Sequence, residues 1–265
     1  MRLSIIMPGV RVQNWLEVYE SIPNATTLPK KEYELVIVSP YDLPPELKDI
    51  ENVRLIKDKG CPTRCHQLGL LHSTGEFVVW GADDGIMLPG LALDKAFDVI
   101  SQDKKDIVSL RYGEDHKAAK LEKLSWWHMK NNRLLRRLKH ISRHYLLIMI
   151  ALIRRSYLME IGGWDCRFEH LAFAAHDLSY RIQRDGGVLH FSPLEVMNCD
   201  WTGWDNTSGT RDHAPVHESH SANDQPLFTK IYKPDGGINR TKIDFDNWKS
   251  CPDVWVRRWP NGVPK

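Results

Sequence analysis

Two adjacent carboxylates, Asp83 and Asp84, follow directly on a short apolar run and are framed by Gly81 and Gly85. The run, residues 77–80, is rich in β-branched and aromatic side chains, as a strand buried on both faces of a parallel sheet would be. Open α/β sheets bind their ligands at the carboxyl ends of such strands. Hard oxygen ligands on a tight glycine turn suit Mg²⁺ or Mn²⁺ held jointly with a substrate's phosphates. An Asp-Gly surface turn is an equally good interpretation of this stretch taken alone.

The elements that must position the two acids alternate between strands and helices. Buried strands are predicted at 3–8, 34–38, 53–56, 77–80, 107–110, 145–153 and 188–191, and helices at 14–21, 62–72, 91–100 and 177–184, with a short helix beginning at 154. This alternation predicts an α/β fold, with a mostly parallel sheet and helices on both of its faces. After residue 200 the periodicity is weak, so we expect loops and short elements there that line a site or wrap the core.

Composition narrows the class of protein. The 265 residues are enough to bury a substantial core, and 42% hydrophobic with 26% charged residues is ordinary for a soluble protein. A formal net charge of +2 does not favour nucleic-acid binding. Five scattered cysteines indicate reduced thiols in a cytoplasmic compartment. No signal peptide is evident, and the longest apolar run, residues 146–153, is too short to span a bilayer.

The segment 117–143 is strongly basic. It holds nine Lys or Arg residues against one acid, Glu122, with Leu134, Leu138 and Ile141 at helical spacing. A solvated amphipathic helix that packs on the sheet is the favoured interpretation. The functional alternative is peripheral contact with an anionic membrane surface, or capture of a charged acceptor.

The order of several short motifs resembles a glycosyltransferase of the GT-A fold, closest to the inverting family-2 type. Each motif is weak alone, but together they run in the family's order across residues 3–191. They are Ile5-Ile6-Met7-Pro8, Gln67-Leu68-Gly69, Gly75-Glu76-Phe77, Asp83-Asp84 in the place of Asp-x-Asp, Arg154-Arg155-Ser156, Gly162-Gly163-Trp164-Asp165, and Asp177-Leu178 with Arg181 and Gly186-Gly187.

This resemblance implies a Rossmann-like catalytic domain over residues 1–199. Its parts would be a nucleotide-sugar-binding half (1–112), the basic helical insertion (113–144) and an acceptor half (145–199), with the C-terminal segment 200–265 packed on the same domain and lining the site. The implied reaction is transfer of a sugar from a UDP- or GDP-sugar to a hydroxyl of a glycan, lipid or protein-linked glycan, with Mn²⁺ or Mg²⁺. A catalytically inactive nucleotide- or glycan-binding module, or one that attaches to a membrane surface, is the alternative.

Site residues follow from the same resemblance and from position. The donor would contact residues at the strand ends, and Asp83 and Asp84 would hold the metal with His217 as a third ligand. Arg64, at a helix start, is a candidate phosphate contact, although a plain surface charge is the commoner case. Two departures stand out: Gly81 replaces the first acid of Asp-x-Asp, and Ser39 stands where many members have an Asp. The donor-binding residues predicted are Pro8, Gly9, Ser39, Asp58, Arg64, Asp83 and Asp84.

The transfer also needs a general base that removes a proton from the acceptor hydroxyl. Asp177, predicted at a helix start, is the first candidate, and an N-cap is an equally good interpretation of it. Ala174 and Ala175 occupy the places of the family's Glu-Asp pair, so His176 and Glu169 are alternatives. Sugars stack on aromatic faces, so an acceptor platform is predicted at Trp201, Trp204 and Asp205, with core tryptophans as the default interpretation.

Overall fold

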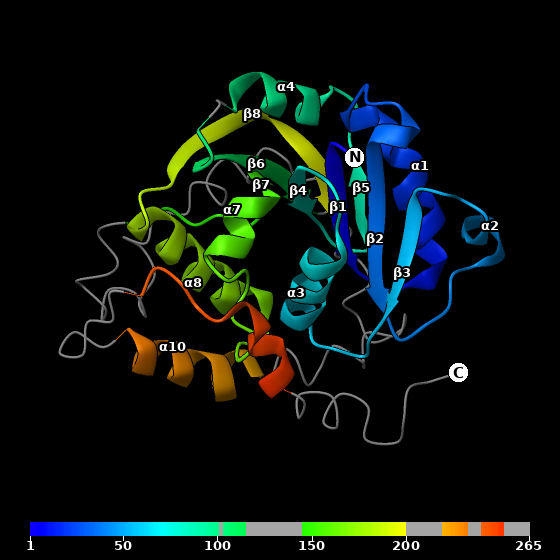
Figure 1. The fold of residues 1–265 in the computed structure, drawn as a ribbon. Coiled ribbons are helices and arrows are strands. Elements are labelled where there is room, and N and C mark those ends of the chain that lie inside the picture. The colour runs from blue at the N-terminus through cyan, green and yellow to red at the C-terminus, as the bar shows by residue number, and fades with distance from the viewer. Residues whose placement is uncertain (101–102, 115–144, 200–218, 233–239, 252–265) are drawn as a thin grey trace.

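The computed structural model describes residues 1–100, 103–114, 145–199, 219–232 and 240–251, and confirms an α/β fold built on one eight-stranded sheet (Figure 1). The strands lie in the order β3-β2-β1-β4-β7-β6-β8-β5. They are β1 Leu3–Pro8, β2 Tyr33–Ser39, β3 Val53–Lys57, β4 Phe77–Trp80, β5 Gly85–Met87, β6 Asp106–Glu114, β7 Ala151–Arg154 and β8 Val188–Cys199.

Helices cover both faces of this sheet (Figure 1). The α-helices are α1 Trp15–Ala25, α2 Pro45–Lys48, α3 Pro62–His72, α4 Ala92–Val99, α7 Arg155–Glu160, α8 Leu171–Arg184 and α10 Gln225–Ile231. Shorter turns of helix are η1 Val12–Asn14, η2 Lys30–Glu32, η7 His220–Asp224 and η8 Phe245–Ser250.

The order and direction of the strands identify the position at which the strand order reverses. β1 pairs in parallel with both β2 and β4, and β2 pairs in parallel with β3. β7 then runs antiparallel to β4 and β6, while β6 and β8 are parallel to each other. The chain moves outward from β1 to β2 and β3, and returns to the other side of β1 to form β4. The strand order therefore reverses between β1 and β4, which is where open α/β sheets bind their ligands.

Side chains of β1 alternate between two hydrophobic cores. Leu3, Ile5 and Met7 pack in the core that includes α1 and α4, whereas Ile6 packs in the core that includes α7, α8 and α10. α3 approaches β1 closely on this second face, because a Cβ at Gly69 would lie 2.3 Å from Cγ2 of Ile6. The alternation is the expected period of a strand buried on both sides.

Two predicted elements differ from the structure. The strand expected at 145–153 is reduced to β7, because the preceding amides bond to α8: Leu146 N donates to Oε1 of Gln183 and Ile148 N to the Ser179 hydroxyl. The helix expected at 177–184 begins earlier, at Leu171, where Nδ1 of His170 accepts a hydrogen bond from the Ala172 amide. The predicted helix start at Asp177 is therefore wrong.

One amide side chain joins three parts of the chain on this second face. Nε2 of Gln67, in α3, donates to the carbonyls of Gly162 and Phe245 at 3.1 and 2.8 Å, and its Oε1 accepts from the Trp164 amide at 2.8 Å. Gly163 has a φ of +65°, and a Cβ there would lie 2.1 Å from Oε1 of Gln67. The Gly-Gly turn thus needs both its backbone conformation and its lack of a side chain.

Candidate active site

The two acids lie at the carboxyl end of β4, beside the loop that follows β1. Gly81 N donates to the Ile6 carbonyl at 3.0 Å, which extends the pairing of the two strands to their ends. Gly85 N then donates to the Ala82 carbonyl at 3.0 Å and closes a turn around the acids. The expectation that the acids follow a buried strand is correct, and the turn stands at the point where the strand order reverses.

Asp83 is held by the loop after β1. Its Oδ2 accepts hydrogen bonds from the amides of Val10 and Arg11, both at 2.6 Å. Its Oδ1 lies 2.5 Å from Nη1 of Arg11, and the residue is only 3% exposed. A solvated surface turn would leave the carboxylate in water, so this geometry opposes that interpretation.

Asp84 turns toward the same cation. Its Oδ2 lies 3.4 Å from Nη1 of Arg11, so one guanidinium nitrogen contacts both carboxylates. Burial opposes the charge of Arg11, but the two acids outweigh it and raise the pKa of the guanidinium above its usual value. The three side chains form an ion cluster, which we call the edge cluster: Arg11, Asp83 and Asp84.

The edge cluster offers part of a divalent-cation site. Two carboxylate oxygens converge on one positive atom, and hard oxygens are the ligands that Mg²⁺ and Mn²⁺ prefer. Within the described ranges, no group of three or more His, Cys, Asp and Glu side chains gathers to hold a metal. The predicted third ligand, His217, lies outside the described residues. At Gly81 a Cβ would lie 3.1 Å from Cε of Met197, so this methionine packs where a first acid would begin.

Hydrogen-bond partners within the chain already engage three other predicted donor contacts, Ser39, Asp58 and Arg64. The buried Ser39 hydroxyl accepts from the Tyr41 amide at 3.0 Å. Asp58 accepts from Nε and Nη2 of Arg64 at 3.1 and 2.9 Å, and Nη1 of Arg64 donates to the Trp248 carbonyl. The charge of Arg64 is thus matched by Asp58, and its role as a phosphate contact stays a prediction.

Pro8 and Gly9 form the backbone that carries the edge cluster. Gly9 N donates to the Val38 carbonyl at 3.0 Å, and a Cβ on Gly9 would lie 2.8 Å from the indole of the buried Trp15. The indole therefore fixes the course of the loop toward Arg11. The predicted contact of Pro8 and Gly9 with a donor is neither supported nor opposed by this packing.

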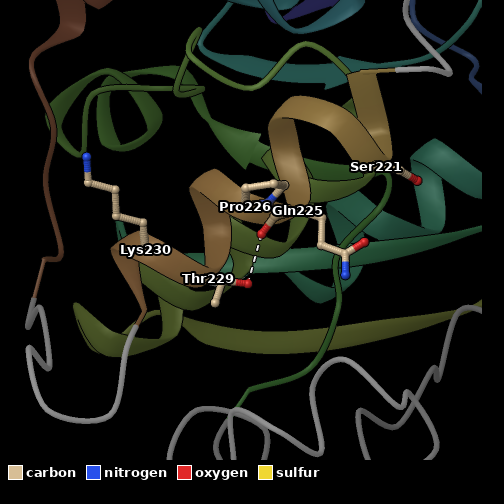
Figure 2. A pocket seen from close by; sticks show the side chains of 5 residues that line it. All are labelled: Ser221, Gln225, Pro226, Thr229 and Lys230. Atoms are coloured by element: carbon tan, nitrogen blue, oxygen red, sulfur yellow. Dashed lines mark hydrogen bonds between the residues drawn. The ribbon is translucent and has the colours of Figure 1, made fainter.

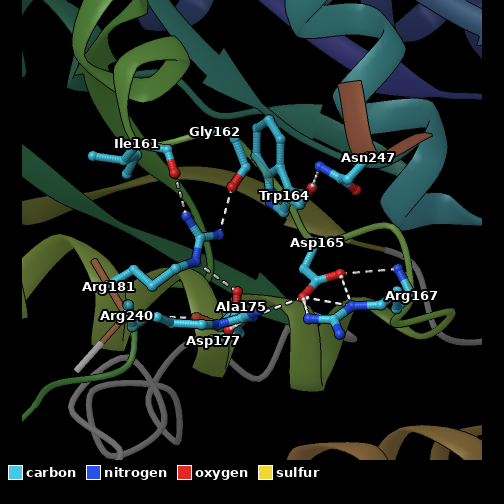
Figure 3. Close-up of polar contacts among 12 residues, drawn as sticks. Ile161, Gly162, Trp164, Asp165, Arg167, Ala175, Asp177, Arg181, Arg240 and Asn247 are labelled. Atoms are coloured by element: carbon cyan, nitrogen blue, oxygen red, sulfur yellow. Dashed lines mark hydrogen bonds and ion pairs between the residues drawn. The ribbon is translucent and has the colours of Figure 1, made fainter. Parts of the chain in front are cut away.

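Asp177 lies in a different environment, inside the second core (Figure 3). Its carboxylate accepts from Nε of Arg181 at 2.8 Å, from the Tyr232 hydroxyl at 2.5 Å, and from Nη2 of Arg240. The residue is completely buried and sits in the middle of α8, so it is not an N-cap. In this arrangement the carboxylate does not reach an acceptor hydroxyl.

The neighbours of Asp177 complete a second ion cluster, which we call the core cluster. Arg181 also donates to the carbonyls of Ile161 and Gly163 at 2.9 and 2.5 Å. Asp165 is paired with Arg240 and Arg167. Burial opposes ionisation of Asp165, but the hydrogen bond from Arg167 and the charge of Arg240 outweigh it and lower its pKa to about 2. The core cluster consists of Asp165, Arg167, Asp177, Arg181, Tyr232 and Arg240.

The alternative bases are also enclosed. His176 is 5% exposed, and burial, with a smaller effect from His220, lowers its pKa to about 4. The Glu169 carboxylate accepts a hydrogen bond from the Ser219 hydroxyl, and the residue is 5% exposed. The predicted acceptor platform, Trp201, Trp204 and Asp205, and the basic segment 117–143 lie outside the described residues.

A surface hollow at η7 and α10 shares no lining residue with either ion cluster (Figure 2). Its lining has no acid or histidine, and the Thr229 hydroxyl donates to the Gln225 carbonyl within the helix at 2.9 Å. The hollow therefore lacks the groups that sugar transfer needs. It is lined by Ser221, Gln225, Pro226, Thr229 and Lys230.

Sequence reasoning missed Arg11, Tyr232 and Arg240. For Arg11 a signal was present, since a basic residue in the loop after the first strand must lie near the ends of the neighbouring strands. For Tyr232 and Arg240 no local signal exists, because their shared partner Asp177 lies 55 and 63 residues away along the chain.

No family model matches the sequence, and no curated protein matches it. Solved structures do match the fold. The crystal structure of S. aureus TarS 1-349 superposes with a TM-score of 0.54 at 12% identity, covering 97% of this chain and 71% of that one. The same protein in complex with UDP gives 0.54 at 14% identity, covering 88% and 70%. Its complex with UDP-GlcNAc gives 0.54 at 13% identity, covering 97% and 79%. At these identities the likeness establishes a shared fold.

Across the described residues, no helix is both long and apolar enough to cross a membrane.

Proposed function

We propose that this chain is a glycosyltransferase that moves a sugar from a UDP- or GDP-sugar to a hydroxyl of a glycan, a lipid or a protein-linked glycan. The edge cluster carries the proposal, because two adjacent carboxylates converge on one cationic atom where the strand order reverses. Such a place in an open α/β sheet is a ligand crevice. Two of the structures that share the fold are complexes with UDP and with UDP-GlcNAc, which supports a nucleotide-sugar ligand.

Asp83 and Asp84 are the residues that would hold a Mn²⁺ or Mg²⁺ ion. When bound, such an ion stabilises the negative charge that develops on a diphosphate leaving group. Backbone amides of the chain already orient one of the two carboxylates. The amides of Val10 and Arg11 fix Oδ2 of Asp83, so that its Oδ1 keeps its orientation.

Removal of the acceptor proton is the second step that sugar transfer requires. Family resemblance assigns it to Asp177 and implies inversion at the sugar. To act as the base, Asp177 would have to exchange Tyr232 and Arg240 for the acceptor hydroxyl. Because the Asp177 carboxylate is completely buried under these contacts, the present geometry favours a positioning role for Asp177.

This saturation of Asp177 supports a second candidate function, a catalytically inactive module that binds a nucleotide or glycan. The two candidates share the donor site and differ in turnover. If a donor binds but neither hydrolysis nor transfer follows with any acceptor tested, the binding module is correct. Turnover that survives Asp177→Asn would instead assign the base elsewhere.

The remaining parts of the proposal come from position and resemblance. Residues 1–112 would bind the donor and 145–199 the acceptor, with 200–265 lining the site through Trp201, Trp204 and Asp205. His217 would complete the metal ligands. A cytoplasmic location, with peripheral membrane contact through 117–143, would suit a lipid-linked acceptor.

Isothermal titration of UDP- and GDP-sugars, each with and without Mn²⁺, tests the central claim. We expect at least one donor to bind and Mn²⁺ to strengthen its binding. Mn²⁺-dependent hydrolysis of that donor needs no acceptor and would identify the enzyme directly. The proposal is abandoned if no UDP- or GDP-sugar binds under either condition.

A further inference from the structure

Arg11 already sits where a metal ion would be expected. Its Nη1 contacts Oδ1 of Asp83 at 2.5 Å and Oδ2 of Asp84 at 3.4 Å, and these are the oxygens that a divalent ion would use. A guanidinium nitrogen and a divalent ion cannot both occupy this position, because they would lie within a few ångströms of each other as like charges. Cation binding at the edge cluster therefore requires Arg11 to leave.

Arg11 has unused hydrogen-bonding capacity. A guanidinium carries five N–H donors, and only Nη1 is engaged with the acids. Nε and Nη2 make no hydrogen bond to any residue that the structure describes, and the side chain is 21% exposed. The other arginine at this edge, Arg64, differs, since its Nε and both terminal nitrogens are bonded to Asp58 and Trp248.

The free nitrogens and the place of Arg11 suit a phosphate. Guanidinium groups bind phosphate oxygens through two parallel hydrogen bonds, which a single lysine ammonium cannot reproduce. A nucleotide diphosphate that enters between the ends of β1 and β4 would arrive beside this side chain. It would give Arg11 a new anionic partner at the same time as it supplies a divalent ion with further oxygen ligands.

We propose that Arg11 exchanges partners during binding. Without ligand it neutralises Asp83 and Asp84; when a nucleotide diphosphate and a divalent cation bind, it moves to the phosphates and releases the carboxylates to the cation. The cation alone then binds weakly, and the nucleotide strengthens its binding, because both ligands favour the same displaced arginine. This inference rests on the proposed function and assigns Arg11 as the residue that couples binding of the nucleotide to binding of the cation.

Mn²⁺ affinity without nucleotide is the first measurement, made by electron paramagnetic resonance of free Mn²⁺. Arg11→Ala is expected to bind Mn²⁺ about tenfold more tightly than the natural protein, since a competing positive charge is gone. Arg11→Lys keeps the charge and should stay within about threefold of the natural protein. Arg2→Ala, at the opposite end of β1, is the matched control and should change nothing.

UDP affinity at saturating Mn²⁺ is the second measurement, made by isothermal titration, with GDP as a parallel probe. Here Arg11→Ala should bind UDP about tenfold more weakly, because the bidentate phosphate contact is lost. The UDP affinity of Arg11→Lys should lie between those of the natural protein and Arg11→Ala. In the natural protein UDP should strengthen Mn²⁺ binding severalfold more than it does in Arg11→Ala.

The two effects have opposite signs, which separates them from simple damage to the fold. A partly unfolded Arg11→Ala would lose both ligands, and its melting temperature would fall; Arg11→Lys then carries the test. Equal Mn²⁺ affinity in the natural protein and Arg11→Ala overturns the exchange, as does unchanged UDP affinity. If UDP binds to the natural protein and to both Arg11 variants and strengthens Mn²⁺ binding equally in all three, only this inference fails. If neither UDP nor GDP binds to any form, the proposed function fails and the exchange fails with it.

Discussion

Arginine contacts two carboxylates in two regions of this protein. The two regions differ in how exposed the arginine is and in how many of its hydrogen-bond donors are used. In the edge cluster, one guanidinium serves Asp83 and Asp84 through a single nitrogen and remains one-fifth exposed. One of its partners, Asp83, is held by two backbone amides. The charges there are close enough to attract each other, and the arginine is in part open to solvent.

In the core cluster the central carboxylate has no accessible oxygen left for a ligand. Asp177 is fully buried and receives hydrogen bonds from Arg181, Tyr232 and Arg240, while Arg181 spends its other nitrogens on two backbone carbonyls. A buried ion network of this kind favours one conformation, and removal of one member leaves the others without compensation. Similar residue types therefore leave a partly exposed arginine in the edge cluster and form a buried network in the core cluster.

The largest predicted effect removes the central charge of the core cluster. Asp177→Asn leaves the buried Arg181 uncompensated and Arg240 with Asp165 as its remaining acid, so we expect the free energy of unfolding to fall by about 3–5 kcal/mol. Urea denaturation measures it. Asp98→Asn, a surface partner of Lys95, should change stability by less than about 0.5 kcal/mol. A stable Asp177→Asn that binds donor but has lost turnover would reverse the comparison and make this carboxylate the base.

A substitution in the turn at Gly163, whose carbonyl accepts a hydrogen bond from Arg181, should lower the free energy of unfolding by nearly as much. Gly163→Ala combines a positive φ with a Cβ 2.1 Å from Oε1 of Gln67, so we expect a loss of about 2–3 kcal/mol. Gly186→Ala is the matched control, since its φ is +86° but no atom lies within 4 Å of the added Cβ. It should cost only about 1 kcal/mol. Equal losses in the two variants would mean that crowding at Gln67 has no effect.

Acid should weaken the core cluster through Asp165. Its pKa is lowered from the ordinary 3.8 to about 2, so its contribution is present above pH 4 and is lost as pH falls from about 4 to about 2. The contribution is about 2 kcal/mol. Urea denaturation of the natural protein and Asp165→Asn should show a stability gap at pH 6 that narrows at pH 3. A gap independent of pH would show that the ion pairs of Asp165 do not stabilise the fold.

The smallest predicted effects on stability belong to the edge cluster, and they should be unequal. Asp83→Ala removes the acceptor for two amides and should cost about 1–2 kcal/mol. Asp84→Ala loses a longer contact with Arg11 and should cost less than about 1 kcal/mol. Thermal unfolding measures both, and Mn²⁺ binding should decline in both. If Asp84→Ala is the more destabilising variant, the assignment of Asp83 as the residue that holds the loop is wrong.

Much of the fold was predictable because local pattern determines it. Apolar runs such as residues 77–80 coincide with the strands, and the glycines around Asp83 and Asp84 correctly indicate a turn at a strand end. The strand at 145–153 was overestimated because apolar composition does not reveal that the amides of Leu146 and Ile148 bond to side chains of α8.

The candidate site was only half predictable, since its contacts join distant parts of the sequence. Arg11 reaches Asp83 across 72 residues, and Arg240 reaches Asp177 across 63. A sequence motif identifies Asp177 as an acid in the right order, but its chemistry depends on these distant partners. The same limit applies to Asp83, whose two amide donors come from the loop after β1.

The contacts of Gln67 have a consequence for which residue can stand at that position. Its side chain must give hydrogen to two carbonyls and take hydrogen from one amide, at partners 95, 178 and 97 residues away along the chain. Only a carboxamide of this length offers both polarities at one end. Glutamate, although the same size, would turn two attractions into contacts between negative oxygens, and lysine would face the Trp164 amide with another donor. One neutral side chain thus decides whether α3, the turn at 162–164 and the segment at Phe245 can pack against one another.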